Sequence, residues 1–334
     1  MKIVIADRNL LPHRAQFDST LPRAATASWH PRFDETALIA DLRDAEVYVG
    51  GTFTPAMAAA ARELQLLHVA GAGTDGVAFH ALAPQVQVAN TFHHEQSIAE
   101  YVVASTILLR RSFLTQDKAL RSGVWASSVY NDTLPQPPAL NTARVGFVGF
   151  GHIGRQSWRM FETFGAVGSA VTGRGQLDAT AEGLQWAADT SQLDRLLEAS
   201  DVLVVSAPLD ERTRGIIGAH ELELLGPDGV LINVGRGPLV QEQALYRALS
   251  TSIIAAAAVD VWYDYPRIGS VTAPSALPFG ELPNILMTPH SSGLTQQTFI
   301  GRTADITDNI GRLHRGEALR NTVRPAVGSK EVHA

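Results

Sequence analysis

The sequence contains no cysteine, and only three of its 27 basic residues are lysines: Lys2, Lys118 and Lys330. Without thiols, the chain forms no disulfide framework, thiolate zinc site or cysteine-ligated iron–sulfur cluster, and it has no cysteine nucleophile. Two of the three lysines lie near the ends of the chain, which argues against Schiff-base chemistry. Any catalysis must therefore use histidine, arginine, carboxylates, hydroxyls or a bound cofactor.

Long hydrophobic runs and an excess of positive charge are absent as well. The longest aliphatic run, 253–259, has seven residues, whereas a transmembrane helix needs about 20. The first residues turn polar too early for a secretory signal. The net charge of −6 argues against a general nucleic-acid binder or a basic membrane-surface protein. We therefore expect a cytoplasmic protein with no nucleic-acid or membrane partner.

The 334 residues of the chain exceed one ordinary domain, which has roughly 100–200 residues. Before about residue 95, short apolar strands alternate with helical patterns, and this order predicts a small parallel sheet. A long helical pattern follows over 97–121, and a loop at 131–141 contains three prolines. A final amphipathic helix is predicted at about 294–315.

The middle of the chain has the alternation of a doubly wound nucleotide-binding domain. Apolar strands are predicted at 143–149, 166–172, 201–206, 230–234, 253–259 and 284–288. Helical patterns separate most of these strands. The predicted fold class is therefore α/β, with two domains that each contain a parallel sheet.

The segment from Arg144 to Arg155 carries the pattern Gly149-x-Gly151-x-x-Gly154 directly after an apolar strand and at the start of a helix. In this context the first glycine permits a tight turn and the second lets the backbone approach a pyrophosphate. The third allows the helix to pack closely on the strand. Because the helix N-terminus would face the phosphates, we predict dinucleotide binding.

The next predicted strand ends in Thr172-Gly173-Arg174. In NAD-binding domains an acidic residue about 20 positions after the fingerprint holds the adenosine ribose, whereas an arginine accommodates the 2′-phosphate of NADP. Here Arg174, with Thr172 beside it, can bind such a phosphate, and Arg155 at the helix start can help. We therefore expect NADP(H) to be preferred, with NAD(H) as the alternative.

Several motifs occur in a fixed order along the chain. They are Ala70-Gly-Ala-Gly-Thr-Asp75, Gly149-Phe-Gly-His-Ile-Gly154, Ala207–Gly215, Leu231–Gly237, Val259-Asp260-Val261 and Pro289-His290. In this order they resemble the motifs of the D-isomer-specific 2-hydroxyacid dehydrogenases. At the predicted cofactor site, the chain is similar to glyoxylate/hydroxypyruvate reductase-type members of that family. From residue 70 to residue 290, the motifs span about two thirds of the chain.

This resemblance implies a Rossmann nucleotide domain, 98–293, inserted into a discontinuous flavodoxin-like substrate domain, 1–97 plus 294–334. It also implies a homodimer, in which the long helix from Ser97 forms part of the interface. Further contacts to the cofactor are implied for residues inside the motifs, namely His152, Ile153, Pro208, Val234 and Asp260, the last of which would touch the nicotinamide carboxamide.

Arg236 follows an apolar strand within Asn233-Val-Gly-Arg-Gly237. It is therefore expected at the carboxyl end of a sheet strand, where open α/β sheets bind their ligands. A guanidinium can hold a carboxylate through two parallel hydrogen bonds and polarise the adjacent carbonyl. The resemblance implies this role for Arg236. It also implies that the backbone of Ala72 and Gly73 cradles the same carboxylate.

His290 follows a short predicted strand in Met287-Thr-Pro-His290. Reduction of a ketone by hydride requires a proton for the ketone oxygen, and the reverse reaction requires a base. Histidine performs both tasks near neutral pH. His290 is therefore the candidate general acid and base.

The chain departs from the family at the partner of this histidine. The family usually has a glutamate five residues beyond the aspartate that corresponds to Asp260, and this chain has Tyr265 there. A carboxylate beside the imidazole would raise its pKa. Three interpretations remain: Asp264 replaces the glutamate, Tyr265 orients the imidazole or contacts substrate, or turnover has been lost.

The leading hypothesis is an NAD(P)-dependent oxidoreductase that interconverts a small 2-oxo acid and its D-2-hydroxy acid. One alternative is a dehydrogenase of another small anion, of the formate or phosphite type. Another is a catalytically weak protein that senses dinucleotides by binding them. The pair His93-His94 with Glu95 is not followed by a third ligand at recognisable spacing, so we expect no metal.

Overall fold

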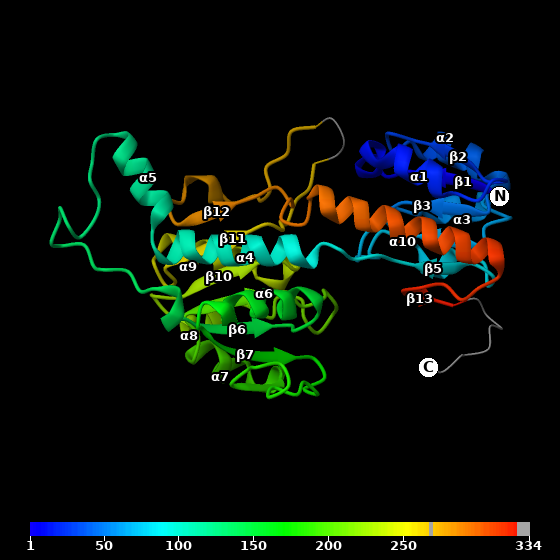
Figure 1. Cartoon of the computed structure of the whole chain (residues 1–334). Helices are drawn as coiled ribbons and strands as arrows, with labels where there is room; N and C mark the ends of the chain where they lie inside the picture. Colours follow the sequence, from blue (N-terminus) through cyan, green and yellow to red (C-terminus); the bar gives the residue numbers. More distant parts are fainter. Residues whose placement is uncertain (267–269, 326–334) are drawn as a thin grey trace. The chain divides into compact units, whose positions relative to one another are not determined.

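The computed structural model describes residues 1–266 and 270–325. It divides into two compact units (Figure 1). Unit 1 comprises Met1–His93 and Leu294–Ala334, and unit 2 comprises His94–Gly293. The last residues of the predicted substrate domain, 326–334, lie outside the described part.

The sheet of unit 1 has the strand order β13-β5-β4-β3-β1-β2. Its strands are β1 (Lys2–Ile5), β2 (Thr26–Trp29), β3 (Val47–Val49), β4 (Leu66–His68), β5 (Gln87–Ala89) and β13 (Thr322–Arg324). Only β13 is antiparallel to its neighbour. Without β13 the order is 2-1-3-4-5, which is that of flavodoxin-like folds. The predicted flavodoxin-like sheet is therefore confirmed.

Successive residues of a strand point to opposite sides of the sheet. Because the apolar residues on both sides are buried, helices cover both faces of this sheet. The helices are α1 (Arg14–Thr20), α2 (Glu35–Asp41), α3 (Pro55–Ala60) and α10 (Gln296–Arg315). Ile3 and Ile5 share a core with Phe17 of α1 and Ile306 of α10. Val4, between them, belongs to the core of α2 and α3.

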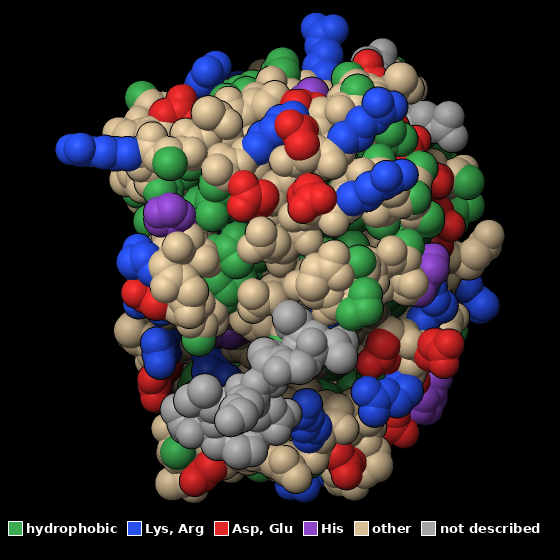
Figure 2. Space-filling view, turned by 90° about the vertical axis from the view of Figure 1, so that its right-hand side faces the viewer, with side chains coloured by type: hydrophobic (Ala, Val, Ile, Leu, Met, Phe, Trp, Pro, Cys, Tyr) green, Lys and Arg blue, Asp and Glu red, His purple; other side chains and the backbone are tan. Residues whose placement is uncertain are grey.

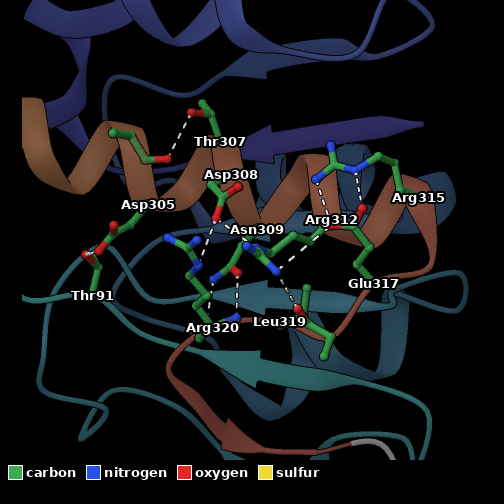
Figure 3. A network of polar contacts seen from close by, with 12 residues as sticks. Thr91, Asp305, Thr307, Asp308, Asn309, Arg312, Arg315, Glu317, Leu319 and Arg320 are labelled. Atoms are coloured by element: carbon green, nitrogen blue, oxygen red, sulfur yellow. Dashed lines mark hydrogen bonds and ion pairs between the residues drawn. The ribbon is translucent and has the colours of Figure 1, made fainter.

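Polar contacts join helix α10 to the N-terminal part of unit 1, at Thr91, and to the segment that follows the helix, at Glu317 and Arg320 (Figure 3). The amide nitrogen of Asn309 lies 3.0 Å from His68 Nε2 and donates to the Arg320 carbonyl oxygen at 3.0 Å. Asn309 Oδ1 in turn accepts the Arg320 N–H. His68 is fully buried, and this burial lowers the pKa of its imidazole to about 4. The ring is therefore neutral at pH 7 and accepts the hydrogen bond at Nε2, because Nδ1 faces the Val69 carbonyl.

The sheet of unit 2 has the order β12-β11-β10-β9-β6-β7-β8, and all its neighbours are parallel. Its strands are β6 (Arg144–Val148), β7 (Val167–Thr172), β8 (Trp186–Asp189), β9 (Val202–Val205), β10 (Val230–Asn233), β11 (Ala256–Val259) and β12 (Ile285–Met287). Read from β8, this is the Rossmann order 3-2-1-4-5-6 with one further strand. The predicted Rossmann fold is confirmed.

The predicted continuous helix over 97–121 is wrong. Helix α4 (Glu95–Arg110) ends before Ser112, and α5 (Phe113–Arg121) begins after it. Ser112 has a φ of 52°, in the left-handed region, which a right-handed helix does not tolerate. The predicted domain boundary at residue 97 falls inside α4.

The other helices of unit 2 are α6 (His152–Thr163), α7 (Leu193–Glu198), α8 (Ala219–Leu225) and α9 (Glu242–Ser250). Helices α4 and α6 pack on one another and share a core with Val145 and Phe147. Helices α7, α8 and α9 bury leucines on the core that contains Leu203 and Leu231. Helices thus cover both faces of the sheet, and its functional groups are exposed at the ends of the strands.

The strand register aligns the carboxyl ends of five strands of unit 2. Val148, Val205, Asn233, Val259 and Met287 are level across the sheet. The residues that follow them are Gly149, Ser206, Val234, Asp260 and Thr288. The motifs found in the sequence therefore meet at one edge, where open α/β sheets bind their ligands.

No described helix combines the length and the apolar character required to cross a membrane. On the face drawn in Figure 2, acidic and basic side chains lie next to one another.

Replacement of Asn309 by Leu keeps a side chain of similar size but removes the partner of the buried His68 Nε2. Because a buried polar group left without its hydrogen bond costs about 1–3 kcal/mol, we expect the midpoint of thermal unfolding to fall by several degrees. In the control, Arg315→Gln breaks an exposed ion pair with Glu317, and solvent screening leaves exposed pairs of this kind with little effect on stability. Differential scanning calorimetry measures both, and equal midpoints for the two variants would contradict this role of Asn309.

Candidate active site

Two glycines of the fingerprint are required by contacts inside the protein. Gly149 has a φ of +88°, and a Cβ there would lie 2.6 Å from the backbone nitrogen of Ala207. A Cβ on Gly154 would lie 2.8 Å from the carbonyl oxygen of Gly149. A Cβ on Gly151, in contrast, would meet no described atom within 4 Å. The space beside Gly151 is therefore open to a ligand.

Helix α6 begins at this open space. Its N-cap is Gly151, which has no side chain to cap the helix, and the first helical hydrogen bond runs from Arg155 N to Gly151 O at 3.0 Å. The amides of the first turn, 152–154, thus point out of the helix end, where they and the helix dipole favour an anion. The residues present fit the pyrophosphate of a dinucleotide.

At the end of β7, Thr172 is level with Asp189 of the neighbouring strand β8. Arg174 is exposed just beyond Thr172, whereas the guanidinium of Arg155 donates to Glu182 at 2.7 Å. Asp189 was missed in the sequence because β8 was not predicted. Its carboxylate accepts hydrogen bonds from the backbone and hydroxyl of Ser191, at 2.9 and 2.6 Å, and these bonds lower its pKa.

Arg236 lies directly beyond β10, in a turn that Asn233 holds. The Asn233 amide donates to the Arg236 carbonyl oxygen at 3.0 Å and accepts the Gly235 N–H at 3.2 Å. Gly237 is required there, because a Cβ would overlap the Trp262 carbonyl. Arg236 is half-buried, and its Nη1 donates to the carbonyl oxygen of Gly235 at 2.9 Å. The guanidinium is thus oriented by its own turn.

A buried carboxylate positions the segment that carries His290. Asp260, 1% exposed, directly follows β11. It accepts hydrogen bonds from the Thr288 hydroxyl, from the backbone N–H groups of Ser291 and Ser292 and from the Ser292 hydroxyl. These four bonds are 2.5–3.1 Å long. They hold the chain on both sides of His290, which has a φ of 56°. The resemblance did not imply this positioning role.

Tyr265 and His290 lie beside one another, with ring centroids 5.7 Å apart. His290 is exposed to solvent on one side, and desolvation by the protein atoms on its other side lowers its pKa; Asp260 acts to raise this pKa, and Arg236 to lower it. Burial raises the pKa of Tyr265, and the same two charges act on it. Arg236, Asp260, Tyr265 and His290 therefore form one electrostatic cluster, in which desolvation and Arg236 favour the neutral imidazole.

The phenol of Tyr265 accepts the Trp262 N–H at 3.1 Å, which holds the tyrosine in the turn after β11. Asp264 is exposed, its backbone N–H donates to the Pro274 carbonyl, and its carboxylate is not among the charges that shift the pKa of His290. These observations favour Tyr265 over Asp264 as the residue that takes the position of the missing glutamate. The roles of both stay predictions.

In unit 1, the predicted carboxylate loop follows β4. Asn90 donates to the carbonyl oxygen of Ala72 at 2.9 Å, and Gly73 is exposed. The guanidinium of Arg302, on α10, lies 3.8 Å from the position of a Cβ on Gly71 and donates from Nε to the Phe92 carbonyl oxygen. The sequence pattern did not single out Arg302, because α10 is about 230 residues away from the loop along the chain.

Among the described residues, one group of candidate metal ligands comes together, formed by Asp194, His220 and Glu221. Asp194 and His220 are exposed, and the Glu221 carboxylate accepts the Gly218 N–H at the start of α8. This group lies outside the predicted site residues.

The sequence profile of the D-isomer specific 2-hydroxyacid dehydrogenase family, NAD binding domain, matches residues 103–292. The chain belongs to this family. Its members are NAD(P)-dependent oxidoreductases of 2-hydroxy and 2-oxo acids, so the predicted enzyme class and nicotinamide cofactor are supported. The predicted family resemblance is confirmed.

Several proteins of known name are similar to this chain over most of its length. A mitochondrial formate dehydrogenase from Solanum tuberosum is 30% identical over 82% of this chain and 71% of its own length. Glyoxylate/hydroxypyruvate reductase B from Enterobacter agglomerans is 30% identical over 70% of this chain and 69% of its own. An NADPH-dependent glyoxylate/hydroxypyruvate reductase from Sinorhizobium meliloti, solved with NADP and malonate, has a TM-score of 0.77, with 26% identity over 96% of both chains.

The replacement of Tyr265 by Glu tests the electrostatics of the cluster. A carboxylate beside the imidazole favours its protonated form, so we expect the pKa of His290 to rise from below 6.5 by about one unit or more. Titration of the His290 Cε1 proton by NMR measures this pKa without substrate.

Asp264→Asn serves as the matched control, because it changes a neighbouring exposed carboxyl. We expect it to leave the pKa of His290 unchanged. A lower pKa in Asp264→Asn would assign the role of the missing glutamate to Asp264 instead.

Proposed function

We propose that the protein reduces a small 2-oxo acid to its D-2-hydroxy acid and prefers NADPH. The observation that carries this proposal is the cluster of Arg236, Asp260, Tyr265 and His290, in which a cation and an imidazole act on one another. The cluster occupies the same sheet edge as the dinucleotide turn at Gly149–Gly154. A carboxylate anchor, a proton donor and a hydride source are the three groups that this reaction requires.

Arg236 would hold the substrate carboxylate. Its planar guanidinium can form two parallel hydrogen bonds with a carboxylate and polarise the neighbouring 2-oxo group. The turn held by Asn233 orients the side chain before substrate arrives, which reduces the entropic cost of binding. By resemblance, the backbone of Ala72 and Gly73 in unit 1 contacts the same carboxylate.

His290 would donate a proton to the ketone oxygen during reduction and accept it during oxidation. Its pKa is below the ordinary value of 6.5 because desolvation and Arg236 disfavour the imidazolium. Reduction requires the protonated ring, so the rate of reduction should fall as the pH rises through this lowered pKa. Oxidation requires the neutral ring and should persist at and above neutral pH.

The cofactor would supply the hydride, and the residues of the glycine fingerprint would contact it. The amides of His152, Ile153 and Gly154 would bind the pyrophosphate beside Gly149 and Gly151. Contacts of Pro208, Val234 and Asp260 are implied by resemblance. For Asp260, hydrogen bonds to Thr288, Ser291 and Ser292 occupy both carboxylate oxygens, so its chief role in this proposal is to position His290.

Preference for NADP would rest on Arg174 and Thr172. Arg174 is exposed beyond the strand end, where it can meet a 2′-phosphate. Asp189 is level with Thr172, but its carboxylate oxygen Oδ1 already caps the turn at Ser191. The NADPH-dependent reductase from Sinorhizobium meliloti supports the same preference.

A second candidate is the oxidation of formate or a similar small anion. The observation that favours it is the 30% identity to the formate dehydrogenase of Solanum tuberosum over 82% of this chain. Because formate has no 2-carbon to reduce, a panel of 2-oxo acids with NADPH, and of formate with each oxidised cofactor, separates the two. A protein that binds dinucleotide but turns over no member of this panel would be a sensor.

We also propose that the protein is a cytoplasmic homodimer. The segment after α5 exposes apolar side chains, among them Val124 at 57%, Trp125 at 61% and Tyr130 at 65%. Such a patch is typical of a protein interface. The dimer is the state that the family resemblance implies.

Replacement of Arg174 by Ala tests the cofactor preference. Loss of a charge-assisted hydrogen bond to phosphate costs about 1.5–3 kcal/mol, or roughly 10–100-fold in affinity. We expect the Kd of NADPH to rise by that factor and the Kd of NADH to stay within about threefold. Arg159→Ala, at an exposed arginine of α6, is the control. Equal losses for NADPH and NADH in fluorescence titrations would refute the assignment.

Replacement of His290 by Gln tests the proton transfer. General acid catalysis contributes about 10²–10⁴-fold, so kcat for reduction should fall by at least 100-fold while the Kd of NADPH changes little. Stopped-flow absorbance at 340 nm and fluorescence titration measure the two quantities. If turnover survives in this variant, His290 is not the acid.

A further inference from the structure

An ion pair in unit 2 joins the fingerprint helix to the connection between β7 and β8. The Nε of Arg155, the fourth residue of α6, donates to the carboxylate of Glu182 at 2.7 Å. The sequence suggested that Arg155 can help to bind a 2′-phosphate, but it did not single out Glu182. A carboxylate is thus bound to a candidate phosphate ligand.

The side chain of Arg155 lies beside the space that is open at Gly151. Arg155 is four residues after Gly151, so the two share one side of the helix, and helical side chains lean toward the N-terminus. In agreement, the guanidinium carbon of Arg155 lies 5.9 Å from the ring centroid of Phe150, which directly precedes Gly151. The guanidinium is therefore close to the end of α6 that favours an anion.

Arg155 also lies on the side of α6 that faces β7. Trp158, three residues farther along the helix, packs against this strand, since a Cβ on Gly168 would lie 2.5 Å from its indole ring. Residues three apart share a helix face, and α6 begins at the carboxyl edge of the sheet. Arg155 is therefore nearer than Trp158 to the end of β7 at Thr172. The adenosine ribose of a dinucleotide binds at this strand end.

The backbone of Glu182 is held in place independently of its side chain. Its carbonyl oxygen accepts the indole N–H of Trp158 at 2.8 Å, and its N–H donates to the Asp178 carbonyl oxygen at 3.2 Å. Leu184, two residues later, is buried in the core beneath α4 and α6. The Glu182 carboxylate therefore stays beside Arg155.

The charge of this carboxylate opposes that of Arg155 at short range. With 2.7 Å between Nε and the carboxylate oxygen, a phosphate several ångströms away meets a dipole and not a net cation. A phosphate monoester carries a charge of about −1.5 to −2 at neutral pH, so it is repelled directly by a nearby carboxylate. A partly exposed ion pair, in contrast, orients its members only weakly. The repulsion should therefore outweigh the orientation of Arg155.

We propose that Glu182 is a specificity-determining residue of the cofactor site, which weakens the binding of a 2′-phosphate by neutralising Arg155. Arg174 remains the cation that favours NADP, and Glu182 limits the degree of this preference. The inference rests on the proposed dinucleotide site at Gly149–Gly154. It concerns the adenosine end of that site, so it is independent of which acid is the substrate.

Glu182→Gln in the full-length protein removes the negative charge and keeps the backbone that Trp158 binds. We expect the Kd of NADPH to fall by about three- to tenfold, and the Kd of NADH to stay within about twofold, because the two nucleotides differ only in the 2′-phosphate. Fluorescence titration measures both. As a control, Glu198→Gln changes the same charge at an exposed residue that ends α7, and it should alter neither Kd.

Two further variants separate an effect of charge from an effect on structure. Arg155→Gln leaves the carboxylate of Glu182 uncompensated, so the Kd of NADPH should rise by at least about threefold. The double variant, Arg155→Gln with Glu182→Gln, lacks both charges, and its Kd should return to within about twofold of the wild-type value. If the pair served only to stabilise the fold, both single substitutions would weaken binding. Circular dichroism checks that each variant is folded.

Ionic strength supplies a second readout that a structural role would not change. The screening length falls from about 10 Å at 0.1 M salt to about 3 Å at 1 M. The gain in NADPH affinity of Glu182→Gln, relative to wild type at the same salt concentration, should therefore shrink between about 0.1 M and 1 M NaCl.

Three results would overturn the proposal. Weaker NADPH binding by Glu182→Gln would mean that the carboxylate orients Arg155, and weaker binding of both nucleotides would mean that it binds the ribose. Unchanged binding of both would place the pair outside the cofactor site. A wild-type protein that binds neither nucleotide would overturn the proposed cofactor site as well. One that binds both but reduces no 2-oxo acid would overturn the proposed function and leave this inference standing.

Discussion

The buried carboxylate of Asp260 is the charge on which the arrangement of the carboxyl edge depends. An ionised carboxylate that is removed from water costs several kcal/mol unless hydrogen bonds replace its hydration. Four donors on Thr288, Ser291 and Ser292 do so here. If the segment moved away from Asp260, the carboxylate would lose these hydrogen bonds, and its desolvation would no longer be compensated. The backbone of His290 is therefore fixed from both sides, although no bond to its ring is needed for that.

This arrangement also determines the acid–base character of the site. A carboxylate hydrogen-bonded directly to the imidazole would favour the imidazolium. Both carboxylate oxygens of Asp260 instead accept hydrogen bonds from backbone N–H groups and hydroxyls. Desolvation and Arg236 then prevail, and the pKa of His290 lies below its ordinary value. Tyr265 adds a ring beside the imidazole but no negative charge at neutral pH, because burial raises the pKa of its phenol.

Charged groups lie at both edges of this sheet. At the carboxyl edge, helix α6 presents its N-terminal amides and Arg236 its guanidinium to solutes. At the amino edge, Asp201 precedes β9 and binds Arg144, while Arg110 lies at the end of α4. Helix α4 contributes to both edges, since Tyr101 in its first half hydrogen-bonds to Thr288, the hydroxyl partner of Asp260.

The sequence alone determined the two α/β folds, the family and the glycine pattern at the start of α6. Long apolar alternation and a glycine pattern are local signals, because strand, turn and helix follow one another within about 20 residues. The missing glutamate was visible in the same way, as Tyr265 at a fixed distance from Asp260.

Only the tertiary structure decided the rest, because the interactions join residues that are far apart along the chain. The left-handed backbone conformation of Ser112 divides a helix that the periodicity of the sequence predicted to be continuous. The edge strand β8 brings Asp189 level with Thr172, and strand pairing of this kind has no local signature in a short, partly polar segment. The hydrogen bonds that Asp260 accepts from Thr288, Ser291 and Ser292 were equally invisible in the sequence. These donors are about 30 residues away from Asp260, and the register of the sheet brings them to it.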